Sequence, residues 1–183
     1  MKNKLLIFGK EYNLKKTISV LLLIMVIGGI LGFIYETIFY RIDLGYFTKR
    51  GSTFGPWIPI YAYGSLLITI LTYRFKDNPL KVFTINTLLT GTLEYLTGFI
   101  LFKFKGIRLW DYNTEILNFG NINGFICARS VLLFGFSSLA LIYLIIPKLL
   151  KWTNKVSDNK LLLISVILAS LFFFDEFIYI VLN

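Results

Sequence analysis

Residues 17–40 read TISVLLLIMVIGGILGFIYETIFY, and this stretch decides the fold class. A helix that crosses the hydrocarbon core of a bilayer needs about 20 mostly apolar residues, and the stretch is long and apolar enough. A secretory signal peptide has a shorter apolar core, followed by a cleavage site of small residues. Neither feature is present, so we expect residues 17–40 to stay in the protein as its first membrane-spanning helix.

Four further apolar segments follow, at about residues 57–73, 80–102, 124–147 and 160–182. Of the 183 residues, 56% are hydrophobic and only 16% are charged, and the mean hydropathy is +0.72. A water-soluble domain carries about 25% charged residues. The sequence therefore predicts an all-α polytopic membrane helix bundle of about five transmembrane helices. We expect a basic arm at residues 1–16 and a single transmembrane domain at residues 17–183.

The net charge of +9 comes from lysines and arginines that lie in short clusters between the apolar segments. Clusters in these places set the orientation of membrane proteins. No nucleic-acid docking motif accompanies them, so we expect no nucleic-acid partner. Twelve cations fall on the amino-terminal arm and the second and fourth linkers, and six on the other linkers. Because positive residues stay in the cytoplasm, we predict a cytoplasmic amino terminus and an outside carboxy terminus, in a multi-pass protein of a bacterial cell membrane.

One cysteine, Cys127, and the lack of histidine limit the chemistry. A lone cysteine forms no internal disulfide, and zinc sites usually need several Cys or His ligands. We therefore expect no metal site and no cofactor. Cys127 is either a small packed thiol or a nucleophile activated by Arg129, and packing is the simpler interpretation.

Five ionisable residues fall inside the predicted spans: Glu36, Glu94, Arg129, Asp175 and Glu176. Each costs about 2.5–3.5 kcal/mol at mid-bilayer, which makes it a candidate for function by default. With the predicted orientation all five lie in the outer halves of their helices, and this favours one polar site that opens outward. We expect Arg129 to pair with Glu94. The alternative is that these side chains lie near span ends and reach headgroup water.

Two helix faces favour the same site. In the first span, one stripe with a spacing of four contains Gly28, Gly32, Glu36 and Tyr40. Its glycines allow another helix backbone to approach closely. In the third span, one face contains Thr87, Thr90, Gly91, Glu94, Thr97 and Gly98. Small and hydroxyl-bearing residues around a carboxylate make a polar groove, although plain helix packing uses the same residues.

The loop before the second span is predicted to be irregular. It contains Gly55, Pro56, Trp57 and Pro59. Glycine and proline interrupt helices, so we predict a broken or re-entrant start to this span, and we expect it to gate the site. An ordinary turn with interfacial aromatic residues is the alternative.

The third linker supplies the other half of a predicted lid. Trp110, Asp111 and Tyr112 follow one another there, and tryptophan and tyrosine anchor at headgroup level. We expect Asp111 to meet Arg50 or Arg108.

Six short motifs in this order resemble a known family over about residues 29–135. They are Gly32-x-x-Tyr35-Glu36, Arg50-Gly51 followed by Gly55-Pro56-Trp57-x-Pro59-Ile60-Tyr61, Leu93-Glu94-Tyr95, Trp110-Asp111-Tyr112, Asn123-Gly124 and Cys127-x-Arg129. The set resembles the small bacterial membrane proteins named "putative ABC transporter permeases", the type IV group. The resemblance implies a membrane subunit driven by a separate ATPase. The chain has no Walker-type glycine loop, so a partner would supply ATP hydrolysis.

The predicted site combines the motif positions with the charges inside the spans. The predicted substrate-binding residues are Glu36, Arg50, Tyr61, Glu94, Asp111, Tyr112 and Arg129. The predicted gating and structural residues are Gly55, Pro56, Trp57, Pro59 and Trp110. No catalytic residue is assigned.

Three functions remain open. The first is a transporter-like or lipid-handling subunit with an outward-facing polar site for a small molecule or lipid headgroup. Its expected partners are membrane lipid and either a second copy of the chain or another membrane subunit. The second is a non-catalytic membrane adaptor or sensor. The third is an intramembrane lipid-modifying enzyme with Glu94 or Asp111 as its base, and it is the least favoured because no catalytic motif accompanies these residues.

Overall fold

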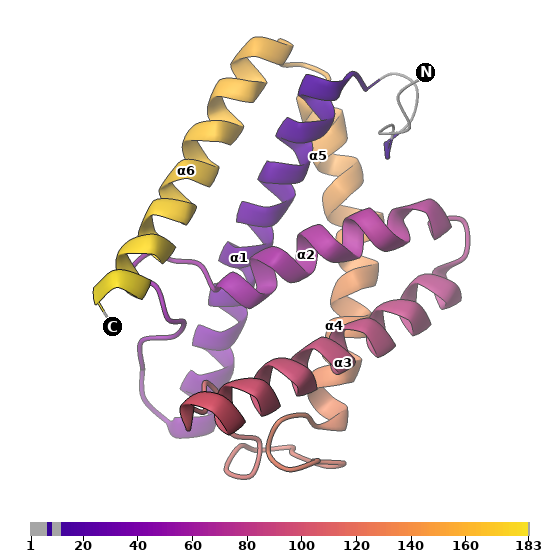
Figure 1. The fold of residues 1–183 in the computed structure, drawn as a ribbon. Helices are drawn as coiled ribbons and strands as arrows, with labels where there is room; N and C mark the ends of the chain where they lie inside the picture. Colours follow the sequence, from indigo (N-terminus) through magenta and orange to yellow (C-terminus); the bar gives the residue numbers. More distant parts are fainter. Residues whose placement is uncertain (1–6, 9–11, 183) are drawn as a thin grey trace. The chain divides into compact units, whose positions relative to one another are not determined.

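The computed structural model describes residues 7–8 and 12–182, so most of the predicted basic arm lies outside the described residues. The described part is helical, apart from its loops and one isolated bridge between Ile122 and Ile126. The helices are α1 (Leu14–Leu44), α2 (Pro59–Thr72), α3 (Pro79–Lys105), α4 (Ala128–Ala140), α5 (Ile146–Thr153) and α6 (Asp158–Leu182) (Figure 1). This confirms the predicted all-α class.

Four helices of the described part are long and apolar enough to cross a membrane: Leu14–Leu44, Pro79–Lys105, Ala128–Thr153 and Asp158–Leu182. The predicted second span corresponds to α2, which has 14 residues and continues as a 3₁₀ turn at Tyr73–Phe75. Residues 51–58 before it are not helical, and α2 starts at Pro59. The predicted irregular start of this span is therefore confirmed. At 1.5 Å per residue α2 extends about 21 Å, less than the ~30 Å of a bilayer core.

The helix of the fourth span starts and ends later than predicted. It starts at Ala128 rather than Gly124, and it passes through a π-helical stretch at Leu141–Ile145 before it ends at Thr153. Pro147 lies just after the π stretch. Proline cannot donate a backbone hydrogen bond and its ring crowds the preceding turn, and a wider π turn accommodates both effects. The linker predicted at residues 148–159 comprises only residues 154–157 in the structure.

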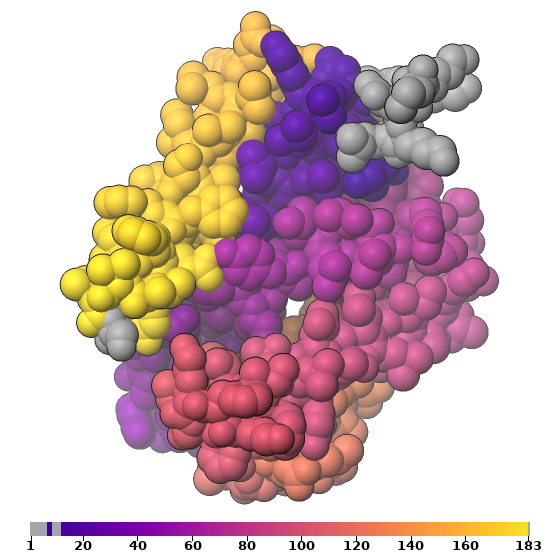
Figure 2. Space-filling view, in the orientation of Figure 1, coloured from indigo at the N-terminus to yellow at the C-terminus, as the bar shows by residue number. Residues whose placement is uncertain are grey.

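The chain divides into two compact units. Unit 1 comprises residues 1–74 and 142–183, and unit 2 comprises residues 75–141. In unit 1, α1 packs against α2, α5 and α6. Figure 1 shows α6 running beside α1, and Figure 2 shows the same contact in space-filling atoms.

The start of α1 is capped by Asn13, whose side chain accepts a hydrogen bond from the Lys16 backbone N–H at 2.9 Å. Its end is at Gly45, which takes the left-handed conformation with φ of 81°. These local signals set the length of the longest helix.

The α1–α2 contact depends on the glycines that the sequence analysis singled out. A Cβ atom built on Gly28 would lie 2.0 Å from Ser65 Oγ, and one built on Gly32 would lie 2.2 Å from Tyr61 Cγ. The backbone N–H of Ile58 also donates to the Gly29 carbonyl at 3.1 Å. The predicted close approach along the Gly28–Gly32 stripe is therefore confirmed. Beside this seam lies a buried apolar cluster of Met25, Val26, Ala62, Ala169 and Phe172.

Unit 2 consists of α3, α4 and the loop between them. Asn78 caps α3 by accepting from the Lys81 backbone N–H at 3.0 Å, and Gly106 ends the helix with φ of 66°. α3 packs against α4, with the Thr87 and Phe83 side chains against Gly135. The loop closes on itself where the Tyr112 N–H donates to the Gly124 carbonyl at 3.0 Å.

Candidate functional site

Asp175 of α6 binds the irregular segment that precedes α2 in unit 1. Its Oδ1 accepts from the Phe54 backbone N–H at 3.0 Å, and its Oδ2 accepts from the Gly55 N–H at 2.8 Å and from Trp57 Nε1 at 2.6 Å. Hydrogen bonds to an ionised acceptor are about twice as strong as neutral ones. A Cβ atom on Gly55 would lie 2.6 Å from the Trp57 ring, so glycine is needed here. Asp175 thus attaches residues 54–57 to α6.

Glu36 and Arg50 form an ion pair in the same unit. Arg50 Nη2 and Nε lie 3.0 and 3.1 Å from Glu36 Oε2. The guanidinium also stacks over the Tyr40 ring, with its central carbon 3.4 Å from the ring centroid. Arg50 therefore connects the segment after α1 back to the last turns of that helix.

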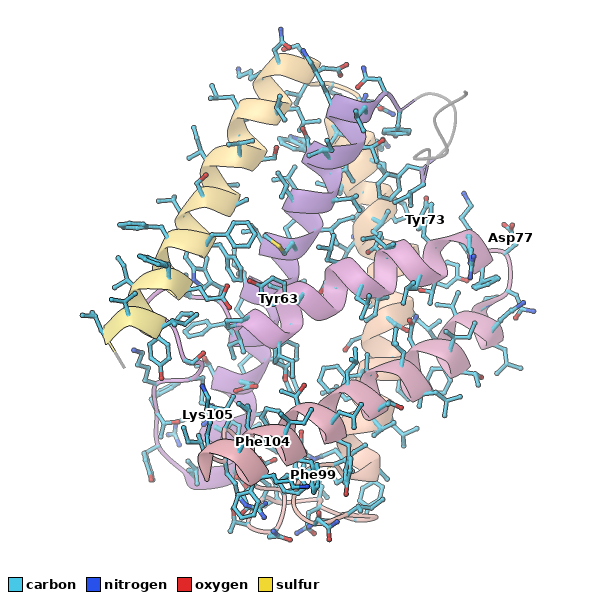
Figure 3. The ribbon with its side chains drawn as sticks, in the orientation of Figure 1. Tyr63, Tyr73, Asp77, Phe99, Phe104 and Lys105 are labelled. Atoms are coloured by element: carbon cyan, nitrogen blue, oxygen red, sulfur yellow. The ribbon has the colours of Figure 1, made fainter. Side chains whose placement is uncertain are left out.

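The other predicted residues of unit 1 have structural contacts. Tyr61 packs against Gly32, and Pro59 is the first residue of α2. Pro56 is exposed. Glu176 accepts a hydrogen bond from Tyr63, a residue of α2 that the sequence analysis did not select and that is labelled in Figure 3.

Glu94 of α3 is the centre of a buried polar cluster in unit 2. The residue is only 4% exposed. Oε1 accepts from the Tyr112 hydroxyl, and Oε2 accepts from the Ser130 hydroxyl at 2.9 Å. Tyr112 comes from the loop and Ser130 from the first turn of α4. The cluster therefore joins three segments through two neutral donors.

Arg129 pairs with Glu115 rather than with Glu94, which corrects the predicted pairing. Arg129 Nη2 donates to Glu115 Oε2, and the two side chains are 13% and 5% exposed. The guanidinium carbon lies 5.4 Å from the Tyr112 ring centroid. The physical reason is the loop, which brings a second carboxylate to Arg129 and leaves the hydroxyls of Tyr112 and Ser130 for Glu94.

Asp111 organises the loop of unit 2. Its Oδ1 accepts from the Asn113 backbone N–H at 3.0 Å and lies 3.5 Å from Arg108 Nη1. Of the two predicted partners of Asp111, the structure therefore shows Arg108. Trp110 Nε1 donates to the Phe125 carbonyl at 2.9 Å, which fixes the neighbouring side of the loop.

The predicted residues thus form separate clusters in the two units. Glu36, Arg50, Tyr61, Asp175 and Glu176 belong to unit 1, and Glu94, Asp111, Tyr112 and Arg129 belong to unit 2. The shared outward cavity stays a prediction. Within the described residues, no three His, Cys, Asp or Glu side chains are grouped to hold a metal ion.

Two members of the unit 2 cluster were missed. Glu115 lies in a loop, where no helical periodicity marks a residue as inward-facing. Ser130 is a single hydroxyl beside Arg129 in an otherwise apolar run. A weak signal was available, because Ser130 is the third residue of α4, where capping side chains are common. Ser130 indeed accepts from the Cys127 backbone N–H at 3.4 Å.

The site's chemistry is that of a buried carboxylate with exchangeable donors. A hydroxyl rotates and can turn from donor to acceptor, so a ligand donor can replace either bond to Glu94 without leaving a broken backbone hydrogen bond behind.

Comparison with known families matches residues 23–180 to the family described as "Putative ABC-transporter type IV". No curated protein and no solved structure matches the chain. The matched range covers α2, α3, α4 and α5 and most of α1 and α6, and thus both clusters of ionisable side chains. This membrane protein therefore belongs to the type IV family of putative ABC transporters.

Proposed function

We propose that the chain is a membrane subunit of a transporter and that the Glu94 cluster of unit 2 binds its ligand, a small molecule or lipid headgroup that carries a positive charge. The single observation that carries this proposal is the burial of Glu94 inside a membrane-length helix with hydrogen bonds from neutral hydroxyls only. An ionisable residue at such a place is costly and marks a substrate or ion pathway by default.

The charge balance of the cluster favours a cation. Glu94 and Glu115 are two carboxylates, and Arg129 is one guanidinium that donates to Glu115. When all three are ionised, one negative charge is in excess. An ammonium group next to Glu94 would cancel this charge. A quaternary ammonium would also make a cation–π contact with the Tyr112 ring.

The segments of the cluster suggest how binding is coupled to movement. Tyr112 belongs to a loop, whereas Glu94 and Ser130 belong to helices. A ligand that displaces the Tyr112 hydroxyl from Glu94 releases one attachment of the loop from α3. Ligand binding would thereby loosen the loop, and ligand-dependent loop movements gate sites in other proteins.

The remaining features of the proposal come from the charge pattern and the family. We place the protein in a bacterial cell membrane as a multi-pass chain, with the amino terminus in the cytoplasm and the ligand site facing outward. A second copy or another membrane subunit would complete the assembly. A separate ATPase is implied by the family alone, and the linker of residues 154–157 offers it little surface.

The first test is a binding measurement on the purified full chain in detergent. Choline and ethanolamine are the cationic probes, and 3,3-dimethylbutan-1-ol, which has the shape of choline without its charge, is the neutral control. We expect the cationic probes to raise the melting temperature of the wild-type protein. Glu94→Gln should abolish the shift. The matched control Glu176→Gln should keep it, because Glu176 bonds to Tyr63 and has no bond to the members of the Glu94 cluster.

Equal shifts with the neutral probe, or an unchanged shift in Glu94→Gln, would overturn the proposed site. Uptake of the bound probe into liposomes then separates the functions. Uptake that needs Glu94 supports the transporter. Binding without uptake would instead support the adaptor or sensor, and a chemically altered probe would support an enzyme.

A further inference from the structure

Three helix ends in unit 1 meet at one surface rich in lysine. α1 and α6 begin there and α5 ends there (Figure 1). Asn154 after α5 accepts hydrogen bonds from Lys16 Nζ at 2.8 Å and from the Tyr12 hydroxyl at 3.3 Å. Lys15 Nζ donates to Asn159 of α6 at 3.5 Å. These bonds join the three ends without neutralising the ammonium groups.

Among the described residues of these three helix ends, positive charges outnumber negative ones. Residues 12–17 and 146–161 contain one carboxylate, that of Asp158. They also contain six lysines, which we call the lysine surface: Lys15, Lys16, Lys148, Lys151, Lys155 and Lys160. Five positive charges are therefore in excess. Such a cluster next to membrane-length helices attracts anionic lipid headgroups.

The packing of α5 leaves Lys148 and Lys151 exposed, and Lys155 is exposed in the turn just after the helix. Ile146, Leu149 and Thr153 are buried, and α5 packs on α1. Lys148, Lys151 and Lys155, at spacings of three and four, are exposed. Apolar contact on one side and ammonium groups on the other leave the lysines free to reach anions.

Trp152 lies within this exposed face and is 43% exposed. Tryptophan beside lysine is the combination found where a membrane helix reaches the headgroup layer. The position of Trp152 at the end of a membrane-length helix therefore favours lipid over a soluble partner.

A recess beside the same surface offers further hydrogen-bond partners. It is shallow and open to solvent, and it is lined by Asn13, Leu14, Lys15, Asp158 and Asn159. The Asn159 side-chain amide lies there beside Lys15.

We propose that the lysine surface binds the headgroups of anionic phospholipids in the leaflet on its side of the membrane. The phosphates would contact the ammonium groups of Lys148, Lys151 and Lys155, and Trp152 would lie among the glycerol and upper acyl groups. This inference rests on the membrane-length helices and is independent of the ligand proposed for Glu94.

The test measures binding of fluorescent phosphatidylglycerol to the full chain in an uncharged detergent, with phosphatidylcholine as the neutral lipid. The variant is Lys148→Gln/Lys151→Gln/Lys155→Gln. Its matched control, Lys49→Gln/Lys103→Gln/Lys105→Gln, removes the same charge from exposed lysines elsewhere. Each lysine near an anionic surface strengthens binding about fivefold. We expect at least tenfold weaker binding in the variant and less than threefold in the control.

A Lys→Arg triple variant at the same three positions should bind like the wild type, because the charge remains. Circular dichroism on every variant checks that the helices are intact. Equal weakening in the variant and the control would overturn the proposal, since net charge alone would then explain binding. Equally tight binding of phosphatidylcholine would also overturn it.

Two further outcomes identify a different occupant. Competition by millimolar glycerol 3-phosphate would show a site for a soluble phosphate compound. Unchanged lipid binding in the variant, together with loss of an acidic subunit that co-purifies with the wild type, would show a protein contact. Either result contradicts the lipid assignment.

Discussion

Asp175 and Glu94 are both carboxylates in membrane-length helices, yet their donors differ in kind. Asp175 in unit 1 accepts from two backbone N–H groups and an indole, all from residues 54–57. Glu94 in unit 2 accepts from two hydroxyls, one in a loop and one in α4. Backbone donors are fixed by the chain, whereas hydroxyls rotate. The first arrangement holds a segment in place, and the second can exchange its donors for those of a ligand.

The packing at one glycine of each unit shows a similar difference. In unit 1 a Cβ on Gly32 would lie 2.2 Å from the Tyr61 side chain, whereas in unit 2 a Cβ on Gly91 would lie 3.3 Å from Ile126 and Val131. The difference is local, because elsewhere in the α3–α4 contact a Cβ on Gly135 would lie 2.3 Å from Thr87 Oγ1. The chain beside Gly91, one turn before Glu94, therefore has more room to adjust than the chain beside Gly32.

The largest effect is expected at the ion pair of unit 2. Arg129→Met removes the guanidinium bound to Glu115 and leaves a buried carboxylate, which costs about 3 kcal/mol of unfolding free energy. Thermal unfolding in detergent measures it. The double variant Arg129→Met/Glu115→Met should recover most of the loss. As a control, Arg108→Met at the more exposed pair with Asp111 should cost less than about 1 kcal/mol. Coupling of Arg129 to Glu94 rather than to Glu115 would contradict the observed pairing.

The next effect tests the packing difference. Gly32→Ala forces the Tyr61 ring away from α1 and should lower the unfolding free energy by about 2–3 kcal/mol. Gly91→Ala should lower it by less than about 1 kcal/mol, because the neighbouring side chains need to shift only by a few tenths of an ångström. Denaturation of both variants in the same detergent makes the comparison. Equal losses would remove the distinction between the two helix contacts.

Asp175 comes third. Asp175→Asn removes the negative charge and places an amide NH₂ against the donors of residues 54–57. We therefore expect the unfolding free energy to fall by about 2 kcal/mol. Limited proteolysis should also cut residues 51–58 faster, because this segment loses its attachment to α6. Glu176→Gln is the neighbouring control and should leave the cleavage rate within twofold. Slow cleavage in Asp175→Asn would mean that other contacts hold the segment.

The smallest stability effect is expected at Glu94. Glu94→Gln keeps an acceptor for Ser130 and avoids burying a charge, so the unfolding free energy should change by less than about 1 kcal/mol. The same substitution abolishes the ligand shift proposed above. The substitution at Asp175 would then lower stability, whereas the substitution at Glu94 would abolish ligand binding with little change in stability. A loss at Glu94 as large as that at Asp175 would give the cluster a structural role.

The sequence predicts most of the helices because their signals are local. The apolar runs of α1, α3 and α6 and the four-residue spacing of Gly28 and Gly32 depend on nothing outside each helix. The predicted end of the fourth span, at residue 147, was wrong because Lys148 and Lys151 suggested a linker. In the structure these lysines lie on the exposed face of a helix whose other face is buried, and charge alone does not distinguish the two cases.

The candidate site could be predicted only in part. Glu94 and Arg129 are visible as charges within apolar segments, so the sequence identifies them. Their partners are decided by the loop conformation, which places Glu115 against Arg129 and Tyr112 against Glu94. Loop residues have no periodicity from which an inward direction can be predicted. The charged residues could therefore be identified from the sequence, but their ion-pair and hydrogen-bond partners could not.

The shortness of α2 has a consequence for how the protein is made. A helix of 14 residues is poorly suited to enter a bilayer on its own, because its flanking backbone would lose water without gaining partners. Synthesis delivers α1 first, and α1 carries the glycine groove that receives Ser65 and Tyr61. Insertion of α2 then becomes a docking reaction onto a helix already in the membrane. A bulky substitution at Gly28 or Gly32 should therefore impair the insertion of α2 as well as the stability of the finished protein.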